Sequence, residues 1–281
     1  MTVFTSTAYS RDLGDELRRV REAGTGMSGA ALAVRLGWDP SKVSNLEHGK
    51  VRATDIDLVQ LFTMCGKDIQ YIDDFRRRYR YAFDEYVVHA PEDVRTARIG
   101  ESAATSITSY SVTKLPSLVQ THEYADALHR LGGFTTGDRI AAAVQHRMDR
   151  QVVLRRNNPP KCLFYIHEFA LQQRVGGRRV MEDQCARLLS EEHSVRVVPM
   201  RAVVPSSGCV LWEYEKAMPV VFSETELAQV FVQDPGAIAR IRLVFDRLAE
   251  VALDEEQSLG KLGEYAGRRR AARDDQGPHA A

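Results

Sequence analysis

The hydrophobic positions near the N-terminus follow the period of an amphipathic helix. Leu13, Leu17 and Val20 recur at spacings of four and three residues, which places them on one apolar face. Short glycine-containing breaks then follow at close intervals, at Gly24–Gly26, Gly37–Pro40, Gly49–Arg52 and Gly66–Lys67. Breaks so close together are typical of a compact cluster of short helices. The pattern predicts an all-helical domain over residues 10–86, and we expect the first ten residues, which are polar, to be loosely held.

Beyond residue 86 the pattern changes from helical to mixed. Residues 87–100 contain His89-Ala90-Pro91 and are predicted to connect two domains. Residues 101–262 are predicted to form an α+β domain, because Lys161–His167 follows a Pro-Pro stop with aromatic and branched residues typical of a strand. Further strands are expected at 194–199, 209–214 and 219–222, the last two as a hairpin, and helices at 121–131, 136–156, 168–173, 178–190 and from Asp234 onward. The charged residues 267–281 are predicted to be disordered.

The first of two adjacent short helices is predicted over residues 29–36. Ser28 is placed to cap its N-terminus. Three of its side chains are expected to point inward: Ala31, Leu32 and Leu36. Gly37 permits the left-handed backbone that ends a helix in a tight turn, so a second helix can follow at once.

The second short helix is predicted to begin after Asp39. This residue is a good N-cap, and Pro40 suits the first turn because its missing N–H costs nothing there. Val43 and Leu46 are expected to anchor the helix in the core. Two short helices with this turn fit DNA, because the major groove is about 12 Å wide and accepts one helix.

Polar side chains on the opposite face of the second helix are the candidate DNA contacts. Asn45 can offer a donor and an acceptor to the edge of an adenine, and Lys42 can reach a guanine acceptor or a phosphate. Ser41, near the helix N-terminus, is placed to bond a phosphate together with free backbone N–H groups. The candidates are completed by Ser44 on the same helix and by three predicted phosphate contacts, Lys50, Arg52 and Arg35.

On periodicity alone, a helical bundle with a solvated polar face explains residues 13–66 as well as a DNA-binding domain does. The motif LGWDPSKVSNLEHG at Leu36–Gly49 favours DNA binding, because it resembles the helix-turn-helix of Cro/lambda-repressor-like (xenobiotic response element, XRE) regulators. The resemblance implies a five-helix lambda-repressor-like DNA-binding domain whose second short helix reads the bases, with Glu47 in a structural role. It also implies a homodimer on a two-fold operator in double-stranded DNA.

Residues from about 101 to 258 resemble a second known domain, domain of unknown function 5753, which follows this type of helix-turn-helix in actinobacterial regulators. The resemblance is carried by Glu101–Ile107, Leu115–Tyr124, Arg150-Gln151, Glu168, Ala170-Leu171, Val175-Gly176, Val198-Pro199 and Ala252-Leu253. Ser117 stands where the family usually has Gly. Many relatives sit beside a small partner protein, and some are described as antitoxin-like. The resemblance therefore implies an alternative function, an antitoxin-like protein-interaction module that binds a small partner and autoregulates.

Polar and charged residues of the second domain are candidates for a ligand or partner pocket: Gln120, Tyr124, Arg150, Gln151 and Glu168. His167 beside Glu168 suggests general acid–base chemistry, but adjacent residues on a strand point to opposite faces. If Glu168 begins the next helix, a first-turn role is commoner, and an ion pair with Arg150 is a structural alternative. We therefore expect no catalytic residue and no enzyme, and a domain for dimerisation, partner docking or effector binding.

Composition narrows the classes of protein that remain. Lys plus Arg and Asp plus Glu number 38 each, and a neutral chain can still bind DNA through one basic face. The four cysteines form no CxxC pair, so we expect neither a zinc site nor disulfides, and a reducing cytoplasm is the simpler location. No segment approaches the roughly 20 apolar residues of a membrane span. No cofactor, metal or membrane is expected.

Overall fold

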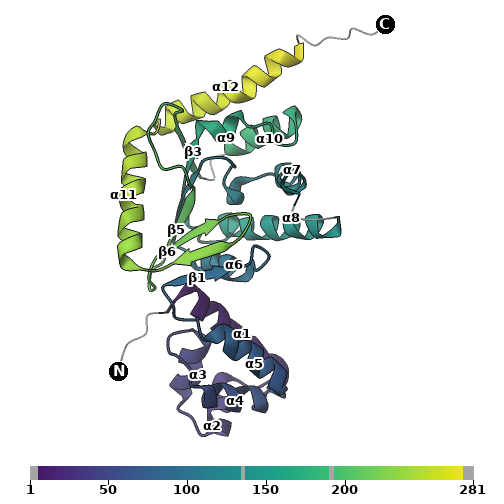
Figure 1. Ribbon diagram of the computed structural model, residues 1–281, viewed down its shortest axis with the longest axis vertical. Coiled ribbons are helices and arrows are strands. Elements are labelled where there is room, and N and C mark those ends of the chain that lie inside the picture. The colour runs from purple at the N-terminus through teal and green to yellow at the C-terminus, as the bar shows by residue number, and fades with distance from the viewer. Residues whose placement is uncertain (1–5, 134–136, 190–192, 275–281) are drawn as a thin grey trace.

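The computed structural model describes residues 6–133, 137–189 and 193–274. Its N-terminal part is a cluster of five short helices, as predicted (Figure 1). They are α1 Ala8–Thr25, α2 Gly29–Leu36, α3 Pro40–Glu47, α4 Asp55–Met64 and α5 Ile69–Tyr79.

Helix α1 begins earlier than expected, so the prediction of a loosely held start is wrong for residues 8–10; residues 1–5 lie outside the described residues. Thr7 and Ser10 cap the first turn reciprocally, because each side-chain oxygen accepts a hydrogen bond from the other residue's backbone N–H, at 2.9 and 2.8 Å. Tyr9 is buried with its ring centroid 4.4 Å from that of His89. The start of α1 is therefore ordered by a distant segment, which local pattern does not reveal.

The C-terminal part is built on a seven-stranded mixed sheet with strand order β1-β7-β6-β5-β2-β3-β4. Three neighbours run parallel: β2 Ser106–Ser111, β3 Lys161–His167 and β4 Ser194–Val198. The other strands pair antiparallel: β1 Tyr86–His89, β5 Cys209–Glu213, β6 Val220–Glu224 and β7 Gln229–Val232. The predicted strand at 161–167 and the β5–β6 hairpin are confirmed, and with them the predicted α+β class.

Strands β1, β2 and β7 lie where the sequence indicated no strand. The predicted connection, 87–100, has regular structure: it contains most of β1 and the start of helix α6, Arg95–Ala103. Strand β2 has the loop-like sequence SITSYS, but Ile107 and Tyr110 are buried, and β3 and β5 pair with its two edges. Pairing with distant strands, rather than local hydrophobicity, makes this segment extended.

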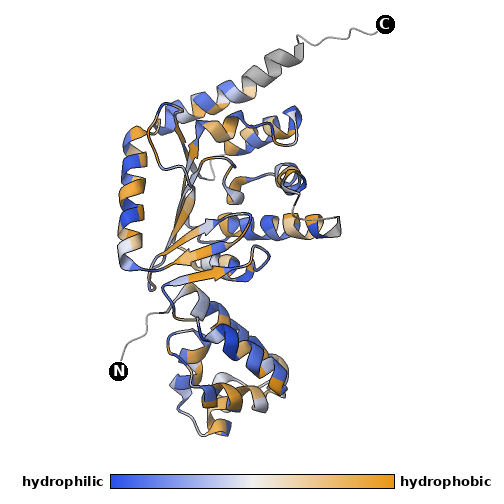
Figure 2. Ribbon diagram, in the orientation of Figure 1, coloured by the Kyte–Doolittle hydropathy of each residue, from blue (hydrophilic) through white to orange (hydrophobic). Residues whose placement is uncertain are grey.

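Helices cover the two faces of the sheet unequally (Figure 1). Helix α11, Pro235–Val251, lies on one face and buries Ile238, Phe245 and Leu248 there, which confirms the predicted amphipathic helix. The other face carries α6 and further elements: η1 Ser117–Val119, α7 His122–Gly132, α8 Asp138–Arg150, η2 Gln151–Arg155, α9 Glu168–Gln172 and α10 Arg178–Leu188. Figure 2 shows hydrophobic residues concentrated along the strands between these layers.

Helix α12, Glu255–Asp274, packs against α10 and β4. Because α12 extends to Asp274, the prediction of disorder is wrong for residues 267–274. Residues 275–281, which belong to the same prediction, lie outside the described residues. The Arg196 side chain of β4 donates hydrogen bonds of 2.9–3.1 Å to the carbonyls of Ala249, Ala252 and Leu253, which satisfies the C-terminal end of α11. Among the helices in the described ranges, none combines the length and apolar character needed to cross a bilayer.

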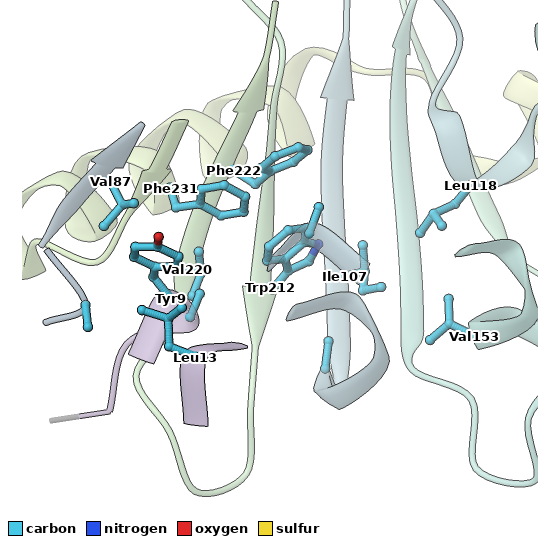
Figure 3. Close-up of a cluster of buried hydrophobic side chains, with 14 of the residues drawn as sticks. Tyr9, Leu13, Val87, Ile107, Leu118, Val153, Trp212, Val220, Phe222 and Phe231 are labelled. Atoms are coloured by element: carbon cyan, nitrogen blue, oxygen red, sulfur yellow. The ribbon is translucent and has the colours of Figure 1, made fainter. Parts of the chain in front are cut away.

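Helix α1 also packs against the sheet of the C-terminal part. Its Tyr9 and Leu13 lie in one buried cluster with Val87, Val220 and Phe231 (Figure 3). The contact is reinforced by charge. Arg95 of α6 forms ion pairs with three acidic residues of α1: Asp12 (2.6 Å), Asp15 (3.1 Å) and Glu16 (3.1 Å).

A second ion pair holds α6 to α8 inside the C-terminal part. Both nitrogens of Arg150 that face Glu101 donate to its carboxylate, at 2.8 and 2.6 Å, and the two side chains are 4% and 3% exposed. Such bidentate geometry compensates two charges that have been removed from water.

We expect Arg150→Met to lower the free energy of unfolding by about 3–5 kcal/mol, because it leaves the Glu101 carboxylate buried without a partner. Urea denaturation measures the loss. Arg130→Met is the control, because Arg130 forms an exposed pair with Asp126 on α7, and its loss should cost less than about 1 kcal/mol. Equal losses in the two variants would contradict this account.

Candidate nucleic-acid interface

Helices α2 and α3 form the predicted helix-turn-helix. The Ser28 side chain accepts a hydrogen bond from Ala31 N–H at 3.2 Å, and Gly37 has a φ of 68°, the left-handed conformation that ends α2. Leu32 is buried and Leu36 half-buried as predicted, but Ala31 is exposed. Ala33, the residue after Leu32, is fully buried in its place.

Helix α3 is anchored by apolar and charged contacts. Val43 and Leu46 are fully buried, as predicted. The Glu47 carboxylate accepts hydrogen bonds from Arg21 Nε and Nη2 of α1, at 2.6 and 2.9 Å, and both side chains are 7% exposed. The backbones of α1 and α3 approach so closely that a Cβ on Gly14 would lie 2.6 Å from the Glu47 carbonyl oxygen. Helix α3 is therefore fixed rigidly to α1, and Glu47 has a structural position.

The outward side of α3 presents a polar stripe, which we define as Ser41, Ser44, Asn45 and His48. These positions are separated by three or four residues, so they share one helix face. Asn45 is half-buried and the other three are exposed. His48 was not among the predicted contacts, although its spacing of four residues from Ser44 was the available signal; its Nδ1 lies 2.7 Å from the Ser44 carbonyl oxygen.

Lys42 does not belong to this stripe. Its Nζ lies 2.6 Å from Asp57 Oδ1 of α4 and 4.3 Å from the centre of the Trp38 ring. Burial alone would raise the pKa of Asp57, but hydrogen bonds from Lys42 and Thr54 outweigh it and lower that pKa below its ordinary value. The predicted contact of Lys42 with a guanine acceptor or a phosphate stays a prediction; in this structure the lysine ties α3 to α4.

The predicted phosphate contact of Ser41 is also altered. Asp39 caps α3 by accepting the Ser41 backbone N–H at 2.7 Å, and hydrogen bonds from the Ser41 side chain and from this N–H lower the pKa of Asp39. A negative charge therefore occupies the helix N-terminus, where a phosphate would otherwise bind the free N–H groups. The Ser41 hydroxyl remains exposed and can contact a base or sugar.

Three cations flank the polar stripe. Lys50 and Arg35 are exposed, and within the described residues neither has an acidic side chain at ion-pair distance. Arg52 is more restrained, because Nη1 donates to the Arg80 carbonyl at 3.1 Å and its guanidinium lies 5.1 Å from the centre of the Phe83 ring. Arg35 at the end of α2 and Lys50 after α3 therefore stay candidates for phosphate contacts.

Four of the five residues predicted to form a pocket in the C-terminal part do lie together, around η1. Gln151 donates to the carbonyls of Ser117 (3.0 Å) and Gln120 (2.8 Å), and Tyr124 accepts the Leu115 N–H through its hydroxyl at 3.2 Å. Arg150 is engaged with Glu101, so these groups mainly bind one another. They form a packed scaffold for η1 and α8.

Glu168 lies elsewhere, so the predicted ion pair with Arg150 is wrong. Its carboxylate accepts hydrogen bonds from the Tyr265 hydroxyl (2.8 Å) and the Met200 N–H (3.1 Å) and pairs with Lys261 (3.1 Å), which attaches α12 to the end of β3. An open hollow of about 760 Å³ lies at the start of β3 and β4, lined partly by Lys161, Ser194 and Glu255, and none of the five predicted pocket residues lines it.

Comparison with known protein families agrees with this division. Residues 94–264 match the family described as a domain of unknown function (DUF5753), and residues 12–70 match a helix-turn-helix domain. The chain therefore belongs to the DUF5753 family, and its helix-turn-helix places it among DNA-binding regulators. No curated protein and no solved structure matches the chain.

The contact between Lys42 and Asp57 makes a prediction about pH. Lys42→Met should lower the free energy of unfolding by about 0.5–1 kcal/mol at pH 7, because the pair is partly exposed. The lowered pKa of Asp57 contributes stability above its unfolded value of about 4, and this contribution is lost as pH falls through the folded pKa. The difference between wild type and variant in urea denaturation should therefore shrink below about pH 4.

Lys67→Met is the control for this experiment, because Lys67 faces the ring of Tyr71 rather than a carboxylate. A stability difference for Lys42→Met that stays constant from pH 7 to pH 3 would argue against the ion pair.

Proposed function

We propose that the protein is a sequence-specific transcriptional regulator of the XRE type that acts in the cytoplasm as a homodimer on a two-fold operator. The observation that carries this proposal is the polar stripe of α3, presented outward by a helix whose other side is fixed in the core. A base-reading helix must hold its side chains in one geometry, and the contacts of Val43, Leu46 and Glu47 provide this.

Each residue of the stripe has a role that its chemistry allows. The Asn45 amide pairs with an adenine edge, and the Ser41 and Ser44 hydroxyls and the His48 ring contact neighbouring base edges or sugars. Lys50 and Arg35 bind phosphates and position the helix, with Arg52 as a more constrained third cation. Lys42 supports the geometry of α3 from behind.

Two copies are proposed because one eight-residue helix reads only a short half-site. Dimeric helix-turn-helix proteins bind half-sites about one helical turn apart, so the operator should have two-fold symmetry. We assign dimerisation, and binding of an effector or a small protein partner, to the C-terminal domain, and propose no catalytic activity for it.

Asn45→Ala should lose discrimination at one base position, by about 1–3 kcal/mol, because a bidentate contact to that base is removed. The operator would be selected from random DNA, and the affinity of both proteins for every single-base variant measured by fluorescence anisotropy. If Asn45→Ala weakens all sequences equally, Asn45 does not read a base.

Lys50→Ala should weaken binding to all sequences and reduce the slope of log affinity against log salt by about 1, because one phosphate contact fewer releases one counterion fewer. Lys216→Ala is the matched control, since Lys216 is 87% exposed and lies beyond β5, in the C-terminal part. An unchanged slope for Lys50→Ala would exclude Lys50 from the phosphate contacts.

A further inference from the structure

Two arginines on α8, one turn apart, have opposite electrostatic surroundings. Arg150 is buried and bidentate on Glu101. Arg147 is half-buried, and no acidic side chain of the described residues lies within ion-pair distance of it. Its one hydrogen bond in the described structure runs from Nη1 to the Oε1 of Gln120, at 2.8 Å. Within the described ranges, most of the five donors of this guanidinium therefore have no protein acceptor.

The surroundings of Arg147 withdraw it from water without neutralising it. Burial lowers the pKa of Arg147, and Glu224 attracts it only from beyond contact distance, while Arg150 repels it. Removing a cation from water is costly unless a counter-charge is supplied. Proteins accept this cost where a bound anion completes the site, and such unpaired, partly desolvated charges mark candidate functional positions.

Gln120 holds the Arg147 guanidinium in place. The Gln120 Nε2 donates to the Leu115 carbonyl at 2.7 Å, and its backbone carbonyl accepts from Gln151 at 2.8 Å, so neither end of the residue can turn. Gln120 is 3% exposed. A neutral amide that orients an arginine leaves the positive charge uncompensated, whereas a glutamate at the same position would have neutralised it.

Donors and cations lie around Arg147, and the carboxylates of Glu224 and Glu101 act on it only from beyond ion-pair distance. His129 lies on α7, which packs against α8, and its Nε2 is buried with no hydrogen bond to a described residue. Burial and the charge of Arg147 lower the pKa of His129. Burial raises the pKa of the Tyr124 hydroxyl to about 12, so this group stays protonated. The charge of Arg147 acts on it electrostatically. Lys114, paired with Glu226, is a further cation near His129.

We propose that Arg147 and His129 bind the oxyanion group, a carboxylate or a phosphate, of a small-molecule effector, with Gln120 as the residue that positions Arg147. The planar guanidinium fork matches either group through two parallel N–H···O bonds. The inference rests on the effector-binding part of the proposed function, but it involves no DNA contact. It moves the ligand site from the predicted group around Arg150, which is already paired, to the unpaired arginine one turn before it.

Thermal unfolding of the full-length protein tests the site without DNA. Sodium chloride is replaced stepwise by sodium phosphate, or by sodium malonate as the carboxylate probe, at constant ionic strength and pH 7. Either probe should raise the Tm of the wild type saturably, by about 2–4 °C, as a ligand that binds only the folded state does. Arg130→Met, which removes an exposed arginine of α7 paired with Asp126, should respond like the wild type. Arg147→Met should lose the saturable rise.

The same variants separate binding from a structural role. In chloride alone, Arg147→Met should unfold close to the wild-type Tm, because the gain from removing an unpaired cation offsets the loss of the hydrogen bond to Gln120, whereas Arg150→Met should unfold well below it. His129→Phe should raise the half-saturating phosphate concentration several-fold. Saturation by phosphate only, or by malonate only, identifies the group that the site takes.

Three outcomes would overturn the proposal: a Tm rise equal in wild type and Arg147→Met, no saturable rise with either probe, or a Tm loss for Arg147→Met in chloride as large as that of Arg150→Met. Because DNA is absent from the assay, each of these outcomes leaves the proposed operator binding untouched, and failure of operator binding leaves the anion site untouched.

Discussion

The packing of helix α1 against two different partners is the contact on which the rest of the structure depends. One end of the helix, with Tyr9 and Leu13, is buried against the sheet, and the middle and far end carry the residues that hold α3 and α4. Apolar burial supplies most of this attraction, and the three carboxylates around Arg95 fix its direction. A helix-turn-helix that shares its first helix with the neighbouring domain has a defined orientation relative to that domain.

The orientation is transmitted to α3 through very close backbone contacts. Gly14 of α1 lies against the last turn of α3, and Gly49, just beyond α3, lies so close to Ser10 that a Cβ there would be 2.4 Å from the Ser10 carbonyl oxygen. The Ser10 hydroxyl also donates to the Gly49 carbonyl at 2.8 Å. The loop that carries Lys50 therefore directly contacts the first turn of α1, which packs on the C-terminal sheet.

The sequence predicted those elements whose determinants are local. The caps Ser28 and Asp39, the left-handed Gly37 and the Pro-Pro stop before β3 act within a few residues, and the structure contains each as expected. Strand β2 was missed because its extended form depends on β3 and β5, and its three serines weaken the strand signal of the other residues. The same limit applies to the site: Lys42 has a partner on α4 and Arg150 has one on α6. The sequence suggested a guanine or a phosphate for Lys42, and a ligand pocket or an ion pair with Glu168 for Arg150.

The unpaired Arg147 shows what sequence reasoning lacks in such a case. A motif can mark an arginine as a candidate ligand contact. Whether a carboxylate lies at ion-pair distance from that arginine is decided by the packing of α7, α8 and η1. The sequence analysis accordingly named Arg150 and not Arg147, and in the structure the difference between them arises from Glu101 of α6, whose carboxylate accepts the hydrogen bonds of Arg150.

The shared helix also determines how the protein can be divided. A fragment cut after residue 86 would expose Tyr9 and Leu13 to water and leave Asp12 and Asp15 without the guanidinium of Arg95, while the remaining fragment would lose the helix that covers Val87 and Phe231. The boundary between the two matched families is thus not a place where the chain can be cut into two stable fragments. The DNA-binding and C-terminal parts share one buried interface through α1, so we expect them to unfold together.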